Sequence, residues 1–253
     1  MRPTRRPDAD GRTVSATAVG ERLQKRLANA GVGSRREVES WIRAGRLTVN
    51  GKPAALGQKV ILADQIRLDD RLVRQRAVEA EQQTVFLANR SPGEELRDEL
   101  MQRLPKRRGR RFIAISPMPH QDGGLELLTS DGAIAAQLQR LCGQVASEFR
   151  IRIRGDLPPL QRTAVLAGQL DDGAQIQVLS LEDAGGEGVN HWLKLRSRGA
   201  SGREVRQLME RHGALVSRVM RISMGSVVLT KDLPRGHFKQ LQPAELRKLL
   251  DCE

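Results

Sequence analysis

Residues 114–132 read AISPMPHQDGGLELLTSDG, and the pattern around this stretch indicates the fold. An apolar segment at 112–115 predicts a short strand that ends at a loop with two prolines. An apolar strand pattern follows around Glu126, and from 133 to 141 the apolar residues return at helical spacing. Strands followed by helices in this way indicate an α+β domain.

The same mixture of strands and helices continues on both sides of that stretch. Strand patterns occur at 85–88, 175–181, 192–196 and 216–229, and helical patterns at 94–104, 203–212 and 244–250. Between residues 149 and 154 three apolar residues alternate with three arginines, which predicts a half-buried strand with a basic outer face. The glycine-rich residues 185–188 are predicted to form a loop between strands, without the order of a phosphate-binding loop.

A first compact unit is expected over residues 21–74. Its first helix is predicted to end at Gly31-Val32-Gly33. Ser34 with Glu37 three residues later predicts a capping box at the start of a second helix. Asn50-Gly51 is a turn signal between two strands. The residues expected on the apolar faces of the two helices are Leu23, Leu27, Ala30, Val38, Trp41 and Ile42.

The domain organisation follows from these patterns. Residues 1–20 lack apolar periodicity and are expected to be a flexible basic tail. The unit at 21–74 is followed by a polar linker at 75–84 and by an α+β domain at 85–253.

Charge favours a polyanionic partner. The net charge is +13 and the sequence pI is about 10.9, and each phosphate that a Lys or Arg neutralises releases condensed counterions. A merely soluble basic protein is the alternative, but the clustering of the charge favours nucleic acid. Aromatic residues make up 2% of the chain, with no Tyr, so recognition of folded RNA by shape and phosphates fits better than base stacking.

Several classes of protein are excluded by the sequence. Cys142 and Cys252 are too few and too far apart for a disulfide framework or a metal site, and the four His residues show no ligand spacing. No cofactor or metal is therefore expected. No apolar run reaches membrane length and the N-terminus lacks an apolar signal core, so a soluble cytoplasmic protein is expected.

The first unit resembles the alpha-L RNA-binding domain, which a small-subunit ribosomal protein shares with many RNA-modifying enzymes. The matching residues are Leu23, Leu27, Gly31, Ser34, Arg35, Ile42, Gly45, Val49, Asn50, Gly51, Val60, Asp64 and Ile66. In that family the start of the second helix and its neighbours face RNA phosphates. The resemblance therefore implies RNA contacts at Lys25, Arg26, Arg35, Arg36 and Arg46. A solvated charged face is the alternative for any single Arg, but a cluster at a helix N-terminus favours RNA.

The second unit resembles the bacterial pseudouridine synthases that modify ribosomal RNA. Residues 124–132 are similar to part of their catalytic loop, and Arg203-Glu204-Val205-Arg206 to their third motif. Leu233-Pro234-Arg235-Gly236 resembles a segment near the end of that domain, and a basic stretch with Arg107 and Arg108 precedes the loop. The resemblance covers about residues 21–250. It implies a mixed, mainly antiparallel sheet domain, with RNA contacts at Arg107, Arg108, Arg203 and Arg206.

The residues that the resemblance would make catalytic are missing. The family's catalytic Asp position is Pro119, its Arg position is Pro117 and its active-site Tyr position is Phe149, whose ring remains for stacking but carries no hydroxyl. The segment that begins at Arg90 lacks the family's Lys-Pro pair. The sequence therefore predicts a monomeric, catalytically inactive homologue that binds structured, ribosomal RNA.

Two alternative functions stay open, and so does the role of Arg206. An active synthase could use Asp122 as a relocated acid, although in an extended chain it would lie roughly 10 Å from the lost position. Arg206, which the resemblance pairs with the missing Asp, is either free for phosphate or bound to Asp122, Glu204 or another acid. The chain could also be an assembly or stress factor that recognises an aberrant ribosomal particle.

Overall fold

The computed structural model describes residues 20–73, 84–105 and 111–251. The chain divides into two compact units between Ala77 and Val78, within the expected linker. The expected tail and linker lie almost wholly outside the described residues, as do Arg107 and Arg108.

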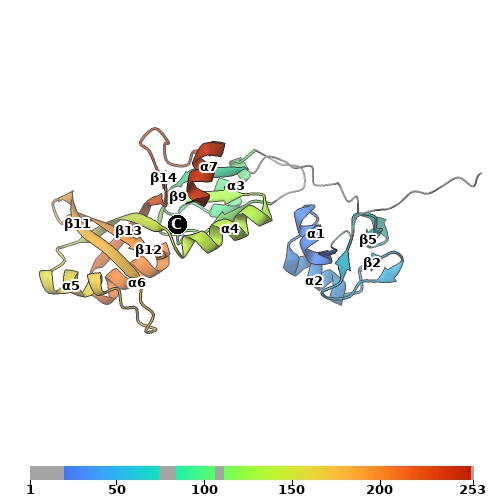
Figure 1. The fold of residues 1–253 in the computed structure, drawn as a ribbon. Helices are drawn as coiled ribbons and strands as arrows, with labels where there is room; N and C mark the ends of the chain where they lie inside the picture. The colour runs from blue at the N-terminus through green and yellow to red at the C-terminus, as the bar shows by residue number, and fades with distance from the viewer. Residues whose placement is uncertain (1–19, 74–83, 106–110, 252–253) are drawn as a thin grey trace, which may run out of the picture. The chain divides into compact units, whose positions relative to one another are not determined.

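The first unit packs two helices on small sheets (Figure 1). Its antiparallel four-stranded sheet has the order β3-β2-β5-β6, and β1 pairs with β4. The core joins the buried faces of both helices to residues of the sheets, among them Leu47 and Ile66. The elements are β1 (Glu21–Arg22), α1 (Leu23–Asn29), α2 (Arg35–Arg43), β2 (Leu47–Val49), β3 (Lys52–Pro53), β4 (Lys59–Val60), β5 (Ile66–Leu68) and β6 (Arg71–Leu72).

The local signals in this unit are confirmed. The Ser34 hydroxyl accepts a hydrogen bond from the Glu37 amide at 3.2 Å, and the Glu37 carboxylate accepts one from the Ser34 amide at 2.6 Å. Asn50 and Gly51 have φ values of 51° and 78°, the positive pair that a tight type I′ hairpin between β2 and β3 requires. The prediction that Ala30 lies on the apolar face of the first helix is wrong, because Ala30 lies just beyond α1 and is exposed.

The second unit is built on a nine-stranded, mainly antiparallel sheet. The order is β11-β12-β10-β13-β9-β7-β15, with β14 on β13 and β8 on β9, and the β9–β13 pair is parallel. The strands are β7 (Val85–Arg90), β8 (Ile113–Ile115), β9 (Gly123–Thr129), β10 (Ala146–Arg154), β11 (Gln177–Glu187), β12 (Asn190–Arg198), β13 (Leu215–Met224), β14 (Val227–Val228) and β15 (Phe238–Gln240). The predicted mixed, mainly antiparallel sheet is confirmed.

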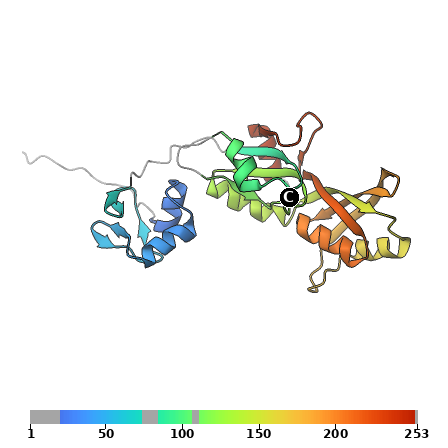
Figure 2. The same ribbon diagram turned by 180° about the vertical axis from the view of Figure 1, so that it is seen from behind.

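The helices of this unit pack in three groups. The helices are η1 (Leu96–Leu100, π-helical), α3 (Met101–Arg103), α4 (Gly132–Cys142), α5 (Pro159–Ala167), α6 (Gly202–Arg211) and α7 (Pro243–Leu250). One cluster joins α6 to Phe149, Ile151 and Ile153 of β10, and another joins α4 and α7 to β9. In the third group, η1 and α3 pack against Phe86 and Ala88 of β7. Figures 1 and 2 show α5 and α6 below the strands β11, β12 and β13. The predicted alternation along β10 is confirmed, because Phe149, Ile151 and Ile153 are buried and the arginines between them are not.

The structure differs from the sequence expectations in three local features. The helical pattern at 94–104 forms a π-helical turn and one short α-helical turn. The loop predicted at 185–188 is shorter in the structure. Strand β11 continues to Glu187, and only Gly188 and Val189 form the turn. Helix α5 was not predicted, because it buries only Val165 and shows little apolar periodicity. No helix among the described residues is long and apolar enough to cross a membrane.

Candidate functional site

The candidate site is a hollow where the loop between β8 and β9 meets α6. Its volume is about 480 Å³. Pro117 and Pro119 lie in its wall, at the positions where the resemblance expects an Arg and the catalytic Asp. Arg203 and Arg206 of α6 line the other wall. The structure thus brings the loop and the third motif together, as the resemblance implied.

Asp122 and Arg206 form a buried ion pair beside this hollow. The Arg206 guanidinium donates from Nη2 to Oδ1 at 2.6 Å and from Nε to Oδ2 at 3.0 Å. Oδ1 also accepts from the Val219 amide at 2.8 Å, and Asp122 is fully buried. The hydrogen bonds that Arg206 donates to Asp122 raise the pKa of Arg206, and burial opposes this shift. The sequence left open whether Arg206 is free for phosphate or bound to an acid, and in the structure it is bound to Asp122.

Arg206 has further partners. Its Nη1 donates to Glu210 at 2.9 Å and to the Val216 carbonyl at 3.1 Å. A guanidinium bound to two carboxylates and a carbonyl has few donors left for phosphate. Arg203 is exposed on the same helix and is the better candidate for an RNA contact there.

The expected separation between position 119 and Asp122 is wrong. The Asp122 amide donates to the Pro119 carbonyl at 3.0 Å, so residues 119–122 form a turn and not an extended segment. A β-turn brings its first and fourth Cα atoms within about 7 Å. Asp122 therefore lies nearer to position 119, where the resemblance expects the catalytic Asp, than it would in an extended chain.

Beneath the loop lies a buried network of Arg90, Glu126 and Arg221. Arg90 Nε donates to Glu126 Oε1 at 2.9 Å, and Arg221 Nη2 lies 3.4 Å from Oε2. All three side chains are at most 2% exposed. Burial raises the pKa of Glu126 although Arg221 and Arg90 act to lower it, and burial lowers the pKa of Arg221.

This network holds the backbone of the loop. Arg90 Nη2 donates to the carbonyls of Met118 at 2.7 Å and Pro119 at 2.6 Å. Arg221 Nη1 donates to the Ser116 carbonyl at 2.8 Å, and the Met118 amide donates to Glu126 at 3.0 Å. The sequence placed Glu126 in an apolar strand pattern, but nothing in it identified its two arginine partners.

Phe149 is not available for stacking, which corrects the sequence expectation. Its ring is fully buried and belongs to the same core cluster as Met118 of the loop. The loop also closes on the start of α6, because a Cβ at Gly202 would lie 2.3 Å from the Met118 sulfur. The space where an aromatic ring could meet a base is therefore filled by the protein's own side chains.

The basic residues expected to contact RNA in the first unit differ in their surroundings. Arg35 and Arg36 are exposed at the start of α2 and form no ion pair with the residues that the structure describes. Lys25 pairs with Glu21 at 3.1 Å. Arg46 donates to both oxygens of Asp69, at 2.8 Å and 2.5 Å, and this contact raises the pKa of Arg46. Arg26 is partly buried.

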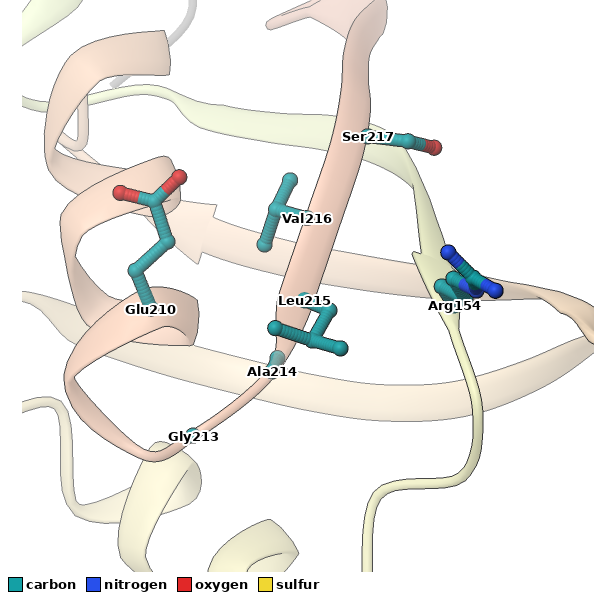
Figure 3. Close-up of a pocket in the computed structure, with 7 residues that line it drawn as sticks. All are labelled: Arg154, Glu210, Gly213, Ala214, Leu215, Val216 and Ser217. Carbon is teal, nitrogen blue, oxygen red and sulfur yellow. The ribbon is translucent and has the colours of Figure 1, made fainter.

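A second hollow of about 590 Å³ lies at the start of β13. Figure 3 shows Glu210 of α6 and Arg154 of β10 on opposite sides of that strand. Because Glu210 already binds Arg206, this hollow lacks a set of polar groups that converge on one point. Within the described part of the chain no group of three or more His, Cys, Asp or Glu side chains could hold a metal ion.

Comparisons with known proteins agree with this arrangement. The S4 domain model matches residues 21–66, the unit expected to be an alpha-L domain. The ribosomal large subunit pseudouridine synthase B of Escherichia coli O6:H1 is 38% identical over 247 residues, which cover 92% of this chain and 84% of that protein. The chain belongs to the ribosomal large subunit pseudouridine synthase B family.

Other members of this family are similar to the chain to the same degree. The synthase B of Vibrio cholerae is 39% identical over 253 residues, covering 92% of this chain and 76% of that protein. The synthase B of Pseudomonas aeruginosa is 36% identical over 236 residues, and the chain spans 61% of its length. A crystal structure of a pseudouridylate synthase has the same fold, with a TM-score of 0.61 at 19% identity, over 90% of this chain and 99% of that one.

Proposed function

We propose that this member of the synthase B family binds structured ribosomal RNA and does not isomerise uridine. The observation that carries the proposal is Pro119 in the wall of the hollow, where the family resemblance expects the catalytic Asp. The reaction requires a carboxylate as nucleophile or proton carrier at the uracil glycoside, and a proline side chain offers neither. Pro117 and the buried Phe149 remove two further groups of the same site.

The hydrogen bonds and the burial of Asp122 indicate that it does not replace the catalytic Asp. Both of its oxygens accept hydrogen bonds within the protein, and the side chain has no exposed surface. A catalytic group has to lie about 3 to 3.5 Å from the atom with which it reacts. A substrate could reach Asp122 only if the side chains that cover it moved, because the carboxylate has no exposed surface.

RNA binding is supported by charge and by the first unit. The net charge of +13 favours a polyanion, and an S4 domain model matches residues 21–66. Arg35 and Arg36 lie exposed at the capped N-terminus of α2, where helix amides and the macrodipole also attract phosphate. Ribosomal RNA is the favoured class because the relatives are named large subunit pseudouridine synthases.

Two observations favour an active enzyme as the second candidate. Asp122 has taken the pairing with Arg206 that the resemblance assigns to the catalytic Asp. The turn at 119–122 also brings Asp122 close to the lost position. An active form would therefore use Asp122 as its acid, with Arg206 as the orienting partner.

Release of tritium from uridine labelled at carbon 5 tests the proposal. The substrate is large-subunit ribosomal RNA, both naked and in particles. We expect the protein to bind this RNA and to release no label above background. Asp122→Asn is the matched variant, since it keeps the shape of the side chain and removes its charge. Release by the unmodified protein that disappears in folded, RNA-binding Asp122→Asn would contradict the proposal and favour the relocated acid.

A further inference from the structure

The outer face of β10, β12 and β13 gathers arginines that the candidate site does not use. We call it the basic sheet face, and its residues are Arg150, Arg152, Arg154, Lys194, Arg196, Arg198 and Arg218. The register places Arg152 directly opposite Arg218 on one side and Trp192 on the other. Arg150 lies opposite Lys194 in the next row. Residues directly opposite in an antiparallel pair point to the same face, so three strands contribute to one surface.

This face lies on the other side of the sheet from α6. The residues that alternate with the arginines of β10, such as Ile151, pack against Val205 and Leu208 of α6. Figure 3 shows the same division, with Arg154 and the α6 side chain Glu210 on opposite sides of β13. The candidate hollow is lined by α6, so the basic sheet face is a separate surface.

Cations outnumber carboxylates on this face, where Glu148 lies opposite Arg196 and Glu182 lies opposite Lys194. Arg150, Arg152, Arg154, Arg196 and Arg218 are each at least partly exposed and form no ion pair with the residues that the structure describes. Lys194 binds Glu182 at 2.6 Å, and Arg198 donates to the Gln144 carbonyl at 2.8 Å. Like charges directly opposite each other in a sheet are destabilising, by up to about 1 kcal/mol. The Arg152–Arg218 pair therefore favours a bound anion over a purely structural role.

We propose that the basic sheet face binds the sugar-phosphate backbone of an RNA duplex. The inference rests on the proposed RNA binding and adds a second binding surface to it. Neighbouring strands lie about 4.8 Å apart and alternate residues about 7 Å apart, so the cations form a grid across a twisted surface. A-form RNA is recognised through such phosphate and shape contacts. Trp192 is the one aromatic residue of the three strands that lies on this face, which disfavours stacking of successive unpaired bases.

Arginine content favours RNA over an acidic protein as the partner. Six of the seven cations on the face are arginines, whose planar guanidinium donates two parallel hydrogen bonds to a phosphate. Phosphates recur along both strands of a duplex, which matches cations spread over several rows.

The test is a salt titration of duplex RNA affinity for Arg152→Ala/Arg218→Ala. The double variant should stay folded, because it removes a repulsive pair from the surface. We expect weaker binding to duplexes of any sequence, and a log-log salt slope that is smaller by about 0.7 to 0.9 for each phosphate that the variant no longer neutralises. The matched control is Arg140→Ala/Arg247→Ala, which removes the same charge from exposed positions on α4 and α7 and should change neither quantity by as much.

The outcomes separate this inference from the proposed function. If the unmodified protein binds no structured RNA, both fail. If the unmodified protein binds RNA and Arg152→Ala/Arg218→Ala behaves like its control, only the role of the sheet face is overturned, and an acidic protein becomes the partner to seek. A larger loss of affinity and slope in the sheet variant than in the control supports the inference.

Discussion

At the scale of single residues, the loop between β8 and β9 is held by charged side chains that are buried beneath it. Arg90 and Arg221 each contact Glu126, and the three side chains also bind backbone groups of Ser116, Met118 and Pro119. Burying ions costs several kcal/mol each, and their attraction offsets this cost only when further hydrogen bonds satisfy them. Here the backbone of the loop supplies those hydrogen bonds. The network therefore explains how the loop that carries Pro117 and Pro119 keeps one conformation.

Replacing the central carboxylate should be strongly destabilising. Glu126→Gln keeps the volume of the side chain but leaves two buried guanidinium groups without a counter-charge. We expect the free energy of unfolding to fall by about 3 to 5 kcal/mol. Urea unfolding at neutral pH measures it. Glu148→Gln, at a partly exposed position on β10, is the control and should change stability by about 0.5 kcal/mol or less. A loss below about 1 kcal/mol for Glu126→Gln would show that the network contributes little.

At the scale of elements, α2 combines a stable start with an exposed charge. The capping box of Ser34 and Glu37 satisfies two of the amides at the start of the helix. Arg35 and Arg36 are the first residues of the helix and are exposed. The helix start therefore forms without help from either arginine, and their charges remain available to phosphate.

Removing both arginines should affect RNA affinity and not folding. For Arg35→Ala/Arg36→Ala we expect weaker binding to many RNAs alike and a salt slope smaller by about 0.7 to 0.9 for each phosphate left without its arginine. Circular dichroism should report unchanged helix content, because alanine has a high helix propensity. Arg43→Ala/Arg71→Ala removes equal charge from exposed sites in the same unit. Equal effects of the two double variants would mean that Arg35 and Arg36 form only a solvated face.

At the scale of the whole molecule, the sequence predicted the patterned parts of the fold and missed interactions between distant residues. The alternation in β10, the capping box of α2 and the turn at Asn50-Gly51 depend on neighbouring residues, so a sequence pattern identifies them. The pairs Arg90–Glu126 and Arg221–Glu126 join residues 36 and 95 positions apart. Charged residues are ordinarily exposed, so a pattern argument assigns such arginines to the surface.

The candidate site was predictable to the same limited extent. Its proline positions and third motif were identified from the sequence, and the structure brings them together around one hollow. The partner of Arg206 was left open, because Asp122 lies 84 positions away and only the tertiary fold joins the two. The strand pattern placed Phe149 on the buried face of β10, but it did not show that core side chains cover the whole ring and leave none of it for stacking.

The most direct test of the central claim is in-cell crosslinking with sequencing of the bound RNA, combined with mapping of pseudouridine at the crosslinked sites. The map is compared between cells with and without the protein. We expect crosslinks to ribosomal RNA and the same pseudouridines in both cells, since the protein binds RNA without isomerising uridine. Two results would contradict the account. One is a lack of crosslinks to ribosomal RNA, and the other is a pseudouridine that is lost with the protein and restored by the unmodified chain but not by Asp122→Asn.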